Sequence, residues 1–147
     1  MRKYENKDKD FIIELSSRFT NFNFLSFRDP IQMEKRQEET ALESINKKSS
    51  NIFIAEEEGI YMGYIELNDT VDYFTRQRQG YISAIAVAKN SEGMGVGKRV
   101  MKKAEKWAQQ KGYDQLVLHL FTANQRAMNF YKNLGYEQEF TVMVKQM

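Results

Sequence analysis

Tyr81–Lys98, YISAIAVAKNSEGMGVGK, is the stretch that decides the fold. Its first part, 81–87, is uncharged, rich in β-branched and small residues and too short for a free-standing helix, so it predicts a buried central strand. A glycine-rich turn follows, and then an apolar pattern at helical spacing that ends at Gly112. The pattern consists of Val96, Val100, Met101, Ala104, Trp107 and Ala108.

A glycine turn between a strand and a helix N-terminus is typical of an anion site. Glycines allow positive φ and close backbone approach, and the helix dipole adds about half a positive charge. We therefore expect a phosphate or pyrophosphate here. A Walker A loop is excluded, because Gly93 and Gly97 are four apart rather than five and Arg99 follows Lys98. A dinucleotide fingerprint is disfavoured, because it requires glycine at position 98.

Length and composition exclude several classes of protein. With 147 residues, we expect one domain, 1–147. The chain has no Cys and one His, which excludes disulfides, Cys-ligated zinc, a Cys acyl-enzyme and a multi-histidine metal site, so no metal is expected. A net charge of +2 makes no electrostatic case for nucleic acid or membrane. No apolar run approaches ~20 residues, and we expect a soluble cytoplasmic protein.

Patterning outlines the rest of the chain. We expect a weak edge strand at 2–5 and a helix from about residue 7, and then a second helix that begins at Asp29-Pro30 and runs to about Lys47. A hairpin of 52–55 and 60–67 should follow, with 68–79 as a long turn. A strand at 115–121 lies parallel to 81–87, because a helix crosses between them. A last helix, 125–134, precedes a half-buried alternating strand at 136–145.

The sequence allows two interpretations for each of two further groups of residues, one aromatic and one acidic. The connector 20–29 is dense in aromatics, which either plug the core under a loop or line an acceptor pocket. The carboxylates of Glu66, Asp69 and Asp72 either attract an amine or are solvated charges at a turn.

From about Gly80 to Tyr136, the chain resembles the GNAT superfamily of N-acetyltransferases. Four pieces in order carry the resemblance: Ile85-Ala86-Val87, Gly95-Val96-Gly97-Lys98, Leu118-His119-Leu120 and Asn124-x-x-Ala127-x-x-Phe130-Tyr131-x-x-Leu134-Gly135-Tyr136. The resemblance implies a mixed α/β GNAT fold with about four main helices. Its central, mostly antiparallel, twisted sheet splays between the strands at 81–87 and 115–121. The first half of the chain matches only in its order of elements.

The resemblance also implies a co-substrate, acetyl-CoA, and its site. Backbone groups of Ile85, Ala86 and Val87 pair with the pantetheine arm like an added strand. The loop of Gly93, Met94, Gly95, Val96, Gly97 and Lys98 holds the pyrophosphate, where Glu92 departs from the family pattern of Gln or Arg. Asn124 contacts the cofactor, and Tyr131 protonates the departing thiolate. The competing interpretation of Tyr131 is a core aromatic at helical spacing with Ala127 and Leu134.

The general base is less well specified. Related alanine N-acetyltransferases of ribosomal proteins place a Glu twelve residues before the tyrosine, and His119 occupies that position here. An imidazole with an ordinary pKa near 6.5 suits a base. The competing interpretation is a satisfied histidine in a buried strand. Glu66 acting through water is the reserve, and water or bulk solvent alone is the third option.

The sequence thus predicts an acetyl-CoA-dependent N-acetyltransferase in which a primary amine attacks directly in a ternary complex, since no Cys is present to carry the acetyl group. The acceptor, a small-molecule or protein amine, stays unidentified. The alternatives are a non-catalytic acyl-CoA-binding or sensory module on the same scaffold, and an ATP-binding protein. Monomer and homodimer both remain open, because the last strand has an edge with which a second copy can pair.

Overall fold

The computed structural model describes residues 1–17 and 27–147. Its sheet is ordered β1-β2-β3-β4-β5, and every neighbouring pair is antiparallel except the parallel pair β4 and β5. The strands are β1 (Arg2–Lys3), β2 (Ile52–Glu57), β3 (Ile60–Val71), β4 (Arg78–Val87) and β5 (Leu116–Leu118). The α-helices in these ranges are α1 (Lys9–Ser16), α2 (Pro30–Lys48), α3 (Val96–Gln110) and α4 (Gln125–Asn133). The predicted mixed fold with a mostly antiparallel sheet is confirmed.

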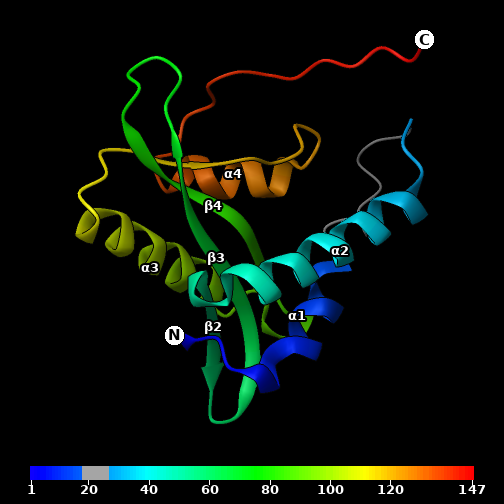
Figure 1. The fold of residues 1–147 in the computed structure, drawn as a ribbon, viewed down its shortest axis with the longest axis vertical. Helices are drawn as coiled ribbons and strands as arrows, with labels where there is room; N and C mark the ends of the chain where they lie inside the picture. The colour runs from blue at the N-terminus through cyan, green and yellow to red at the C-terminus, as the bar shows by residue number, and fades with distance from the viewer. Residues whose placement is uncertain (18–26) are drawn as a thin grey trace.

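Helices cover both faces of the sheet (Figure 1). Successive residues of β2 alternate between the two layers: Ile52 and Ile54 pack with α1 and α2, whereas Phe53 and Ala55 pack with α3. Side chains of a strand point alternately to opposite faces, so a strand buried on both sides reads as a continuous apolar run. Phe130 and Tyr131 bring α4 to the α3 layer.

Local chemistry explains where several elements begin and turn. Asp29 caps α2, its carboxylate accepting from the amide of Ile31 at 3.0 Å, with Pro30 at the first helical position as predicted. Glu58 and Gly59 both have positive φ, 50° and 78°, which matches the two-residue turn that the twist of a hairpin prefers. Positions 18–26, which hold most of the aromatic connector, lie outside the described residues.

The second hairpin is longer than predicted. We expected 68–79 to be a turn, but β3 and β4 remain paired out to Val71 opposite Arg78. Arg78 and Asp69 form an ion pair of 2.6 Å across this part of the ladder, and the Tyr113 hydroxyl donates to the same carboxylate at 3.0 Å. The polar composition of 68–79 therefore led to the prediction of a turn, whereas both strands continue into this segment and their charged side chains pair across the ladder.

The parallel strands β4 and β5 separate after three residue pairs. Gly80, Tyr81 and Ile82 lie opposite Leu116, Val117 and Leu118, and no further pair follows in the described chain. The predicted strand 115–121 is therefore too long, because beyond Leu118 the diverging backbones no longer form a ladder. The splay itself agrees with the predicted architecture.

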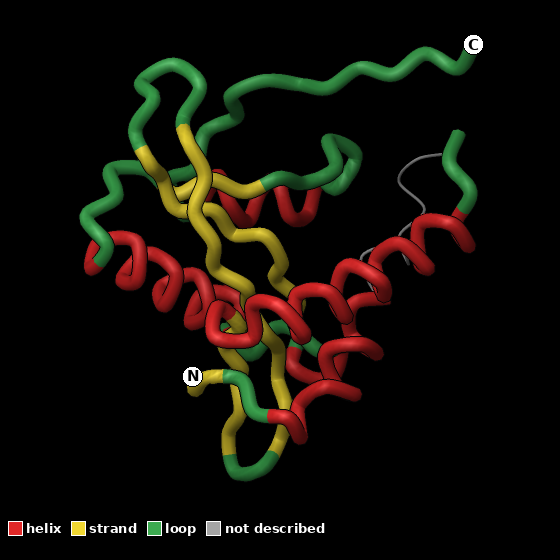
Figure 2. The backbone as a smooth tube through the Cα atoms, viewed as in Figure 1, coloured by secondary structure: helices red, strands yellow, loops and turns green. Residues whose placement is uncertain are grey.

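The C-terminal segment contradicts the prediction of a half-buried strand at 136–145. No strand is assigned there, and Phe140 and Val142 are 75% and 79% exposed. Figure 2 shows this segment as a loop that extends away from the helices and strands. A strand requires a neighbour to satisfy its backbone groups, and no described element of the same chain pairs with this one.

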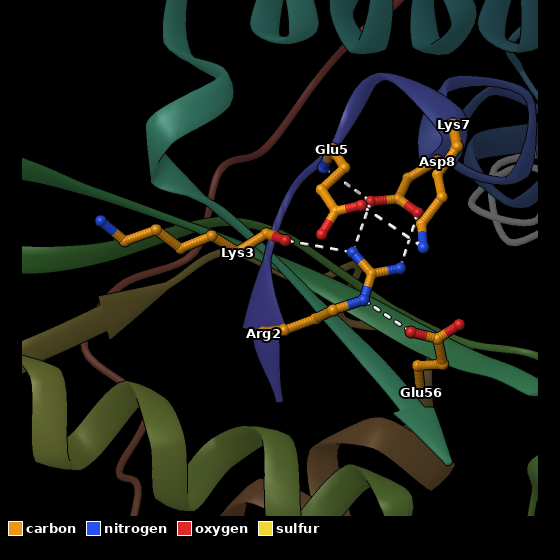
Figure 3. Close-up of polar contacts among 6 residues, drawn as sticks. All are labelled: Arg2, Lys3, Glu5, Lys7, Asp8 and Glu56. Atoms are coloured by element: carbon orange, nitrogen blue, oxygen red, sulfur yellow. Dashed lines mark hydrogen bonds and ion pairs between the residues drawn. The ribbon is translucent and has the colours of Figure 1, made fainter. Parts of the chain in front are cut away.

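A partly buried ionic cluster links Arg2 of β1 to Asp8 and to Glu56 of β2 (Figure 3). The Arg2 guanidinium donates to both carboxylate oxygens of Asp8 at 2.8 Å and to Glu56 at 2.6 Å, while the amide of Glu5 donates to Asp8 at 2.7 Å. The Asp8 side chain is fully buried. Burial alone would raise the pKa of the Asp8 carboxyl, but these hydrogen bonds outweigh burial and hold that pKa below its usual range.

Replacing Asp8 with Asn should lower the free energy of unfolding by about 3 kcal/mol, because it leaves a partly buried guanidinium without its bidentate partner. Urea denaturation measures the loss. Since the folded pKa of Asp8 lies below the unfolded value, its contribution is complete above the ordinary carboxyl pKa of about 3.9 and disappears as pH falls through the folded pKa. The difference between the two proteins should therefore shrink below about pH 4.

The matched control is Lys7→Gln, which breaks the exposed Lys7–Glu5 pair of 3.3 Å. It should change stability by less than about 0.5 kcal/mol. Equal losses in the two variants would show that the Arg2–Asp8 pair contributes no more than a surface pair.

Candidate functional site

Beyond Ile82, no residue of β5 lies opposite β4, and we call this side of 83–87 the open edge of β4. Ile85, Ala86 and Val87 pair with β3 on one side, and all three line a cleft on the other. The register shifts between Glu66 and Leu67, so Ser83 is an extra residue in β4. Bulges bend a strand and often lie beside active sites. The backbone of 85–87 is therefore positioned to pair with an extended ligand.

The glycine turn lies at the end of this strand and opens α3. Gly93 and Gly95 adopt left-handed φ of 77° and 75°, and a side chain on either would meet no atom within 4 Å. These two glycines are therefore needed for conformation rather than for space. Val96 and Gly97 follow as the first residues of α3, whose initial amides have no partner inside the helix. Together with the helix dipole, these amides favour an anion.

Gly97 has a different role from its neighbours. A Cβ on this residue would lie 3.2 Å from the Phe130 ring, so the missing side chain allows α3 and α4 to pack closely. Met94 does not line the cleft: its side chain is exposed, and its amide donates to the Ser91 carbonyl at 3.4 Å. Of the predicted loop residues, Gly93, Gly95, Val96, Gly97 and Lys98 line the cleft.

Glu92, the departure from the family pattern, faces a cation. Its carboxylate lies 3.7 Å from the Arg126 guanidinium at the start of α4, and both residues line the cleft. Arg126 is largely exposed, so the ion pair is weak. The arrangement nevertheless places a positive charge beside the acidic one at the same part of the cleft, which reduces the repulsion that Glu92 alone would exert on an anion.

Asn124 forms the N-cap of α4 and lines the cleft. Its side-chain oxygen accepts from the amide of Ala127 at 3.1 Å. This hydrogen bond uses the side-chain oxygen of Asn124. The side-chain nitrogen carries two further N–H donors. The structure therefore assigns Asn124 a structural role that is compatible with a ligand contact.

Tyr131 projects from α4 into both the core and the cleft. Its ring makes edge contacts with Phe130 and Tyr136 at centroid distances of 5.2 and 5.9 Å, and the residue also lines the cleft. Burial raises the pKa of the Tyr131 phenol to about 12. The side chain is therefore a proton donor, and not a phenolate, at neutral pH.

His119 follows directly after β5 and is exposed, which contradicts the interpretation of a satisfied histidine in a buried strand. Its Nδ1 atom lies 3.3 Å from the Tyr81 hydroxyl, and the two rings are 5.4 Å apart. Both residues line the cleft. Burial and the negative charge of Glu66 raise the pKa of Tyr81, so its hydroxyl remains neutral and can donate to the imidazole.

Glu66 is the buried carboxylate of the cleft, at 6% exposure. Asn68 donates to it at 2.9 Å and to the Ser83 hydroxyl at 2.7 Å, and receives a hydrogen bond from Asn51 at 2.8 Å. A buried carboxylate is retained where hydrogen bonds satisfy it. Of the three acidic residues considered, Asp69 lines the cleft but is paired with Arg78, and Asp72 accepts from the amide of Phe74 within the turn.

These residues surround one cleft of about 1610 Å³. Sites for a single small ligand occupy about 300–1,000 Å³, so this cleft has room for more than one substrate. Its walls come from β3, β4, α2, the α3 N-terminus and α4. Within the described ranges, no group of three or more His, Cys, Asp or Glu residues forms a metal cluster. None of the helices in these ranges is long and apolar enough to cross a membrane.

Two parts of the cleft wall were missed by sequence reasoning. The first is Tyr64 of β3, which lies two residues before the predicted Glu66 and therefore on the same face of the strand. The second is the polar side of α2, and its lining residues include Gln37, Thr40, Ser44 and Lys47. Their spacing of three or four residues places them on one helix face. The sequence shows this spacing, but the same spacing of polar residues is found on any solvent-exposed helix.

Comparisons with known proteins agree with this architecture. The model of the family described as "Acetyltransferase (GNAT) family" matches residues 13–136. The uncharacterised N-acetyltransferase YhfO of Bacillus subtilis is 28% identical over 95 residues, which is 65% of this chain and 64% of YhfO. The chain therefore spans less than two thirds of that relative.

Solved structures share the whole fold. A putative acetyl transferase from Pyrococcus furiosus has a TM-score of 0.77 and 26% identity, covering 97% of this chain and 95% of its own. AAC(6')-Iy, solved with the bisubstrate analogue CoA-S-monomethyl-acetylneamine, has a TM-score of 0.70 and 16% identity, covering 99% and 95%. At that identity, the second likeness concerns the fold alone.

Replacing Asn124 with Ala should lower the free energy of unfolding by about 1 kcal/mol, because α4 loses its cap. Asn124→Ser supplies another capping oxygen and should retain most of that stability. Thermal or urea unfolding of the two variants measures the difference. If Ser and Ala destabilise equally, the hydrogen bond to Ala127 is not what stabilises the start of α4.

Proposed function

The chain belongs to the acetyltransferase (GNAT) family, and from this premise we propose that it transfers an acetyl group from acetyl-CoA to a primary amine within a ternary complex. The observation that carries the proposal is the convergence of an open strand edge, a helix N-terminus and a buried protonated phenol on one cleft. Acetyl-CoA supplies the activated thioester. The residues of the chain bind it, orient it and move two protons.

The donor half of the cleft suits the parts of coenzyme A in order. The initial amides of α3 and the turn of Gly93 and Gly95 present N–H groups for a pyrophosphate. The open edge of 85–87 supplies backbone donors and acceptors for an extended amide chain. The CoA-containing analogue bound by AAC(6')-Iy supports this choice of ligand.

The reaction requires two proton transfers, one from the amine and one to the departing sulfur. An amine with a pKa near 10 must lose a proton before its nitrogen can attack the thioester carbonyl. We assign that proton to His119, with Glu66 acting through water as the alternative. As the carbon–sulfur bond breaks, Tyr131 donates its phenolic proton to the sulfur. Its neutral state at pH 7 follows from its raised pKa.

The acceptor half of the cleft favours a cation. Glu66 places a buried negative charge there, and the phenols of Tyr64 and Tyr81 line the same region. Burial and the Glu66 charge raise the pKa of both phenols, so they stay neutral donors and acceptors. We therefore propose an amine that arrives protonated. The lack of Cys is consistent with a reducing cytoplasm.

The test of this function is thiol release from acetyl-CoA against a panel of amines, with mass detection of the acetylated product. The panel should hold peptide N-termini, lysine, polyamines, amino sugars and small amines. Turnover with at least one amine is expected. Micromolar binding of acetyl-CoA without turnover of any amine would favour the non-catalytic module, and competition by ATP would favour a nucleotide-binding protein.

Tyr131→Phe should reduce kcat by ~10²-fold or more with little change in acetyl-CoA affinity, because only the leaving-group proton is lost. The measurement is steady-state kinetics beside calorimetric binding. Tyr136→Phe is the matched control: it removes a phenol that contacts the Tyr131 ring and donates to Glu105 at 3.3 Å but is not part of the cleft wall. Unchanged kcat in the Tyr131 variant would remove this residue from the mechanism.

His119→Ala should reduce kcat/KM by about 10²-fold and abolish the acidic limb of its pH profile, since general bases contribute factors of about 10²–10⁴. Glu66→Gln is compared in the same buffers. If the limb persists in the His119 variant and vanishes in the Glu66 variant, the buried carboxylate is the base. If both variants keep it, water or solvent accepts the proton.

A further inference from the structure

Tyr81 and His119 meet where β4 and β5 are about to separate. Tyr81 lies opposite Val117 in the parallel pair, and His119 follows two residues later, so the two side chains lie on the same face. The Tyr81 hydroxyl and the His119 Nδ1 atom are 3.3 Å apart. Both residues line the cleft, but His119 is exposed whereas Tyr81 is half-buried. The phenol is therefore the inner member of the pair, and the imidazole is the outer one.

The face that carries this pair is the one that α1 and α2 cover. Tyr81 lies opposite Asn68 of β3, and residues opposite each other in an antiparallel pair share a face. Tyr64 lies on that face too and packs in the layer of α1 and α2. Glu66, between them in β3, accepts a hydrogen bond from Asn68 at 2.9 Å. The pair therefore belongs to the half of the cleft in which we propose that the amine binds.

Tyr81 cannot act as a base by itself at neutral pH. Burial and the negative charge of Glu66 raise the pKa of its phenol, which disfavours a phenolate. A neutral phenol accepts a proton only if it gives up its own proton at the same time, and Nδ1 of His119 lies within hydrogen-bond distance to receive it. The phenol and the imidazole are therefore suited to act as a unit. The other titratable groups that α2, β3 and α4 contribute to the cleft wall are Glu43, Lys47, Lys48, Tyr64, Asp69, Arg126 and Tyr131.

The direction of the hydrogen bond decides which imidazole nitrogen is basic. If the phenol of Tyr81 donates, Nδ1 of His119 is the acceptor and the neutral ring carries its proton on Nε2. The basic lone pair then faces the Tyr81 oxygen. A proton from the amine reaches this lone pair only through the phenol.

We propose that Tyr81 and His119 form one proton relay that carries the amine proton from the cleft to solvent. As the amine nitrogen bonds to the thioester carbonyl carbon, one of its N–H bonds breaks and that proton passes to the Tyr81 oxygen. The original phenolic proton passes to Nδ1 in the same step, so Tyr81 stays neutral. The exposed imidazolium loses a proton to water, and exchange with solvent restores the starting tautomer. The inference rests on the proposed function and adds Tyr81 as the residue that contacts the amine.

His119 is the one histidine of the chain, so the imidazole nitrogen resonances of an isotopically labelled sample can be assigned directly. At a pH where the ring is neutral, their chemical shifts distinguish its two tautomers without any amine or cofactor. We expect the proton on Nε2 in the wild-type protein, and a larger share on Nδ1 in Tyr81→Phe. A wild-type ring protonated mainly on Nδ1, or an unchanged share in the variant, would overturn the inference.

Kinetics of Tyr81→Phe, His119→Ala and the double variant test the relay in the reaction. With an amine that the wild type acetylates, each single change should lower kcat by about 10²-fold and abolish the acidic limb of the pH profile. The double variant should be no slower than either, because the two residues act as a unit. Calorimetry should give an unchanged affinity for acetyl-CoA. The matched control is Tyr113→Phe, which removes a phenol that donates to Asp69 at 3.0 Å outside the cleft wall and should keep the wild-type kcat.

The outcomes separate the relay from its alternatives. Additive losses in the double variant would show that the two residues act independently. A wild-type kcat in Tyr81→Phe beside a slow His119→Ala would show that the imidazole takes the amine proton directly. Either result overturns the relay and leaves the proposed function in place. A wild-type protein that acetylates no amine would instead refute the proposed function, and the relay with it.

Discussion

The pairing of β4 with β5 over only three residues is the constraint on which the rest of the structure depends. Where the two strands touch, at Gly80–Ile82, they are a parallel pair within an otherwise antiparallel sheet. Where they part, the backbone of 85–87 loses a neighbour and faces a cleft. A strand edge that its neighbour leaves in this way can pair with an extended ligand, and the proposed cofactor site rests on that geometry.

Helices α3 and α4 pack in one core. Phe130 and Tyr131 of α4 pack in the same core as α3, and Gly97 lets the Phe130 ring approach that helix. The packing of Phe130 against Gly97 thus holds the N-terminal end of α3 close to α4, the helix that carries Tyr131. Elsewhere in the cleft, Asn68 donates to the buried carboxylate of Glu66 and to the Ser83 hydroxyl. One cleft therefore contains both a helix N-terminus, which favours an anion, and a buried carboxylate.

Local pattern predicted most of the architecture, because it is expressed in contiguous residues. The strand at 81–87, the glycine turn, the helix that follows and the cap at Asp29 each depend on neighbours in sequence, and each was found. The failures depend on distant partners. β5 was predicted too long because its length is set by divergence from β4. The strand at 136–145 was predicted from a local alternation, but no strand of the described residues pairs with it.

The same distinction applies to the site. Gly95 and Asn124 could be identified because a turn and a cap have local signatures, and both line the cleft. Tyr64 and the polar face of α2 were missed, since side-chain alternation alone does not reveal which face of a strand or helix meets a cavity. The pairing of Glu92 with Arg126 was also unreadable, as the two residues lie on separate elements and meet only after folding.

Hydrogen exchange of the β4 amides with and without coenzyme A tests the central claim most directly. If the open edge of 85–87 is the binding edge, coenzyme A should slow exchange in a peptide covering this segment. It should leave a peptide from the β2–β3 turn around Gly59 unchanged. Binding of coenzyme A without added protection at 85–87 would contradict the account, because the ligand would then lie elsewhere and the splay of β4 from β5 would need another explanation.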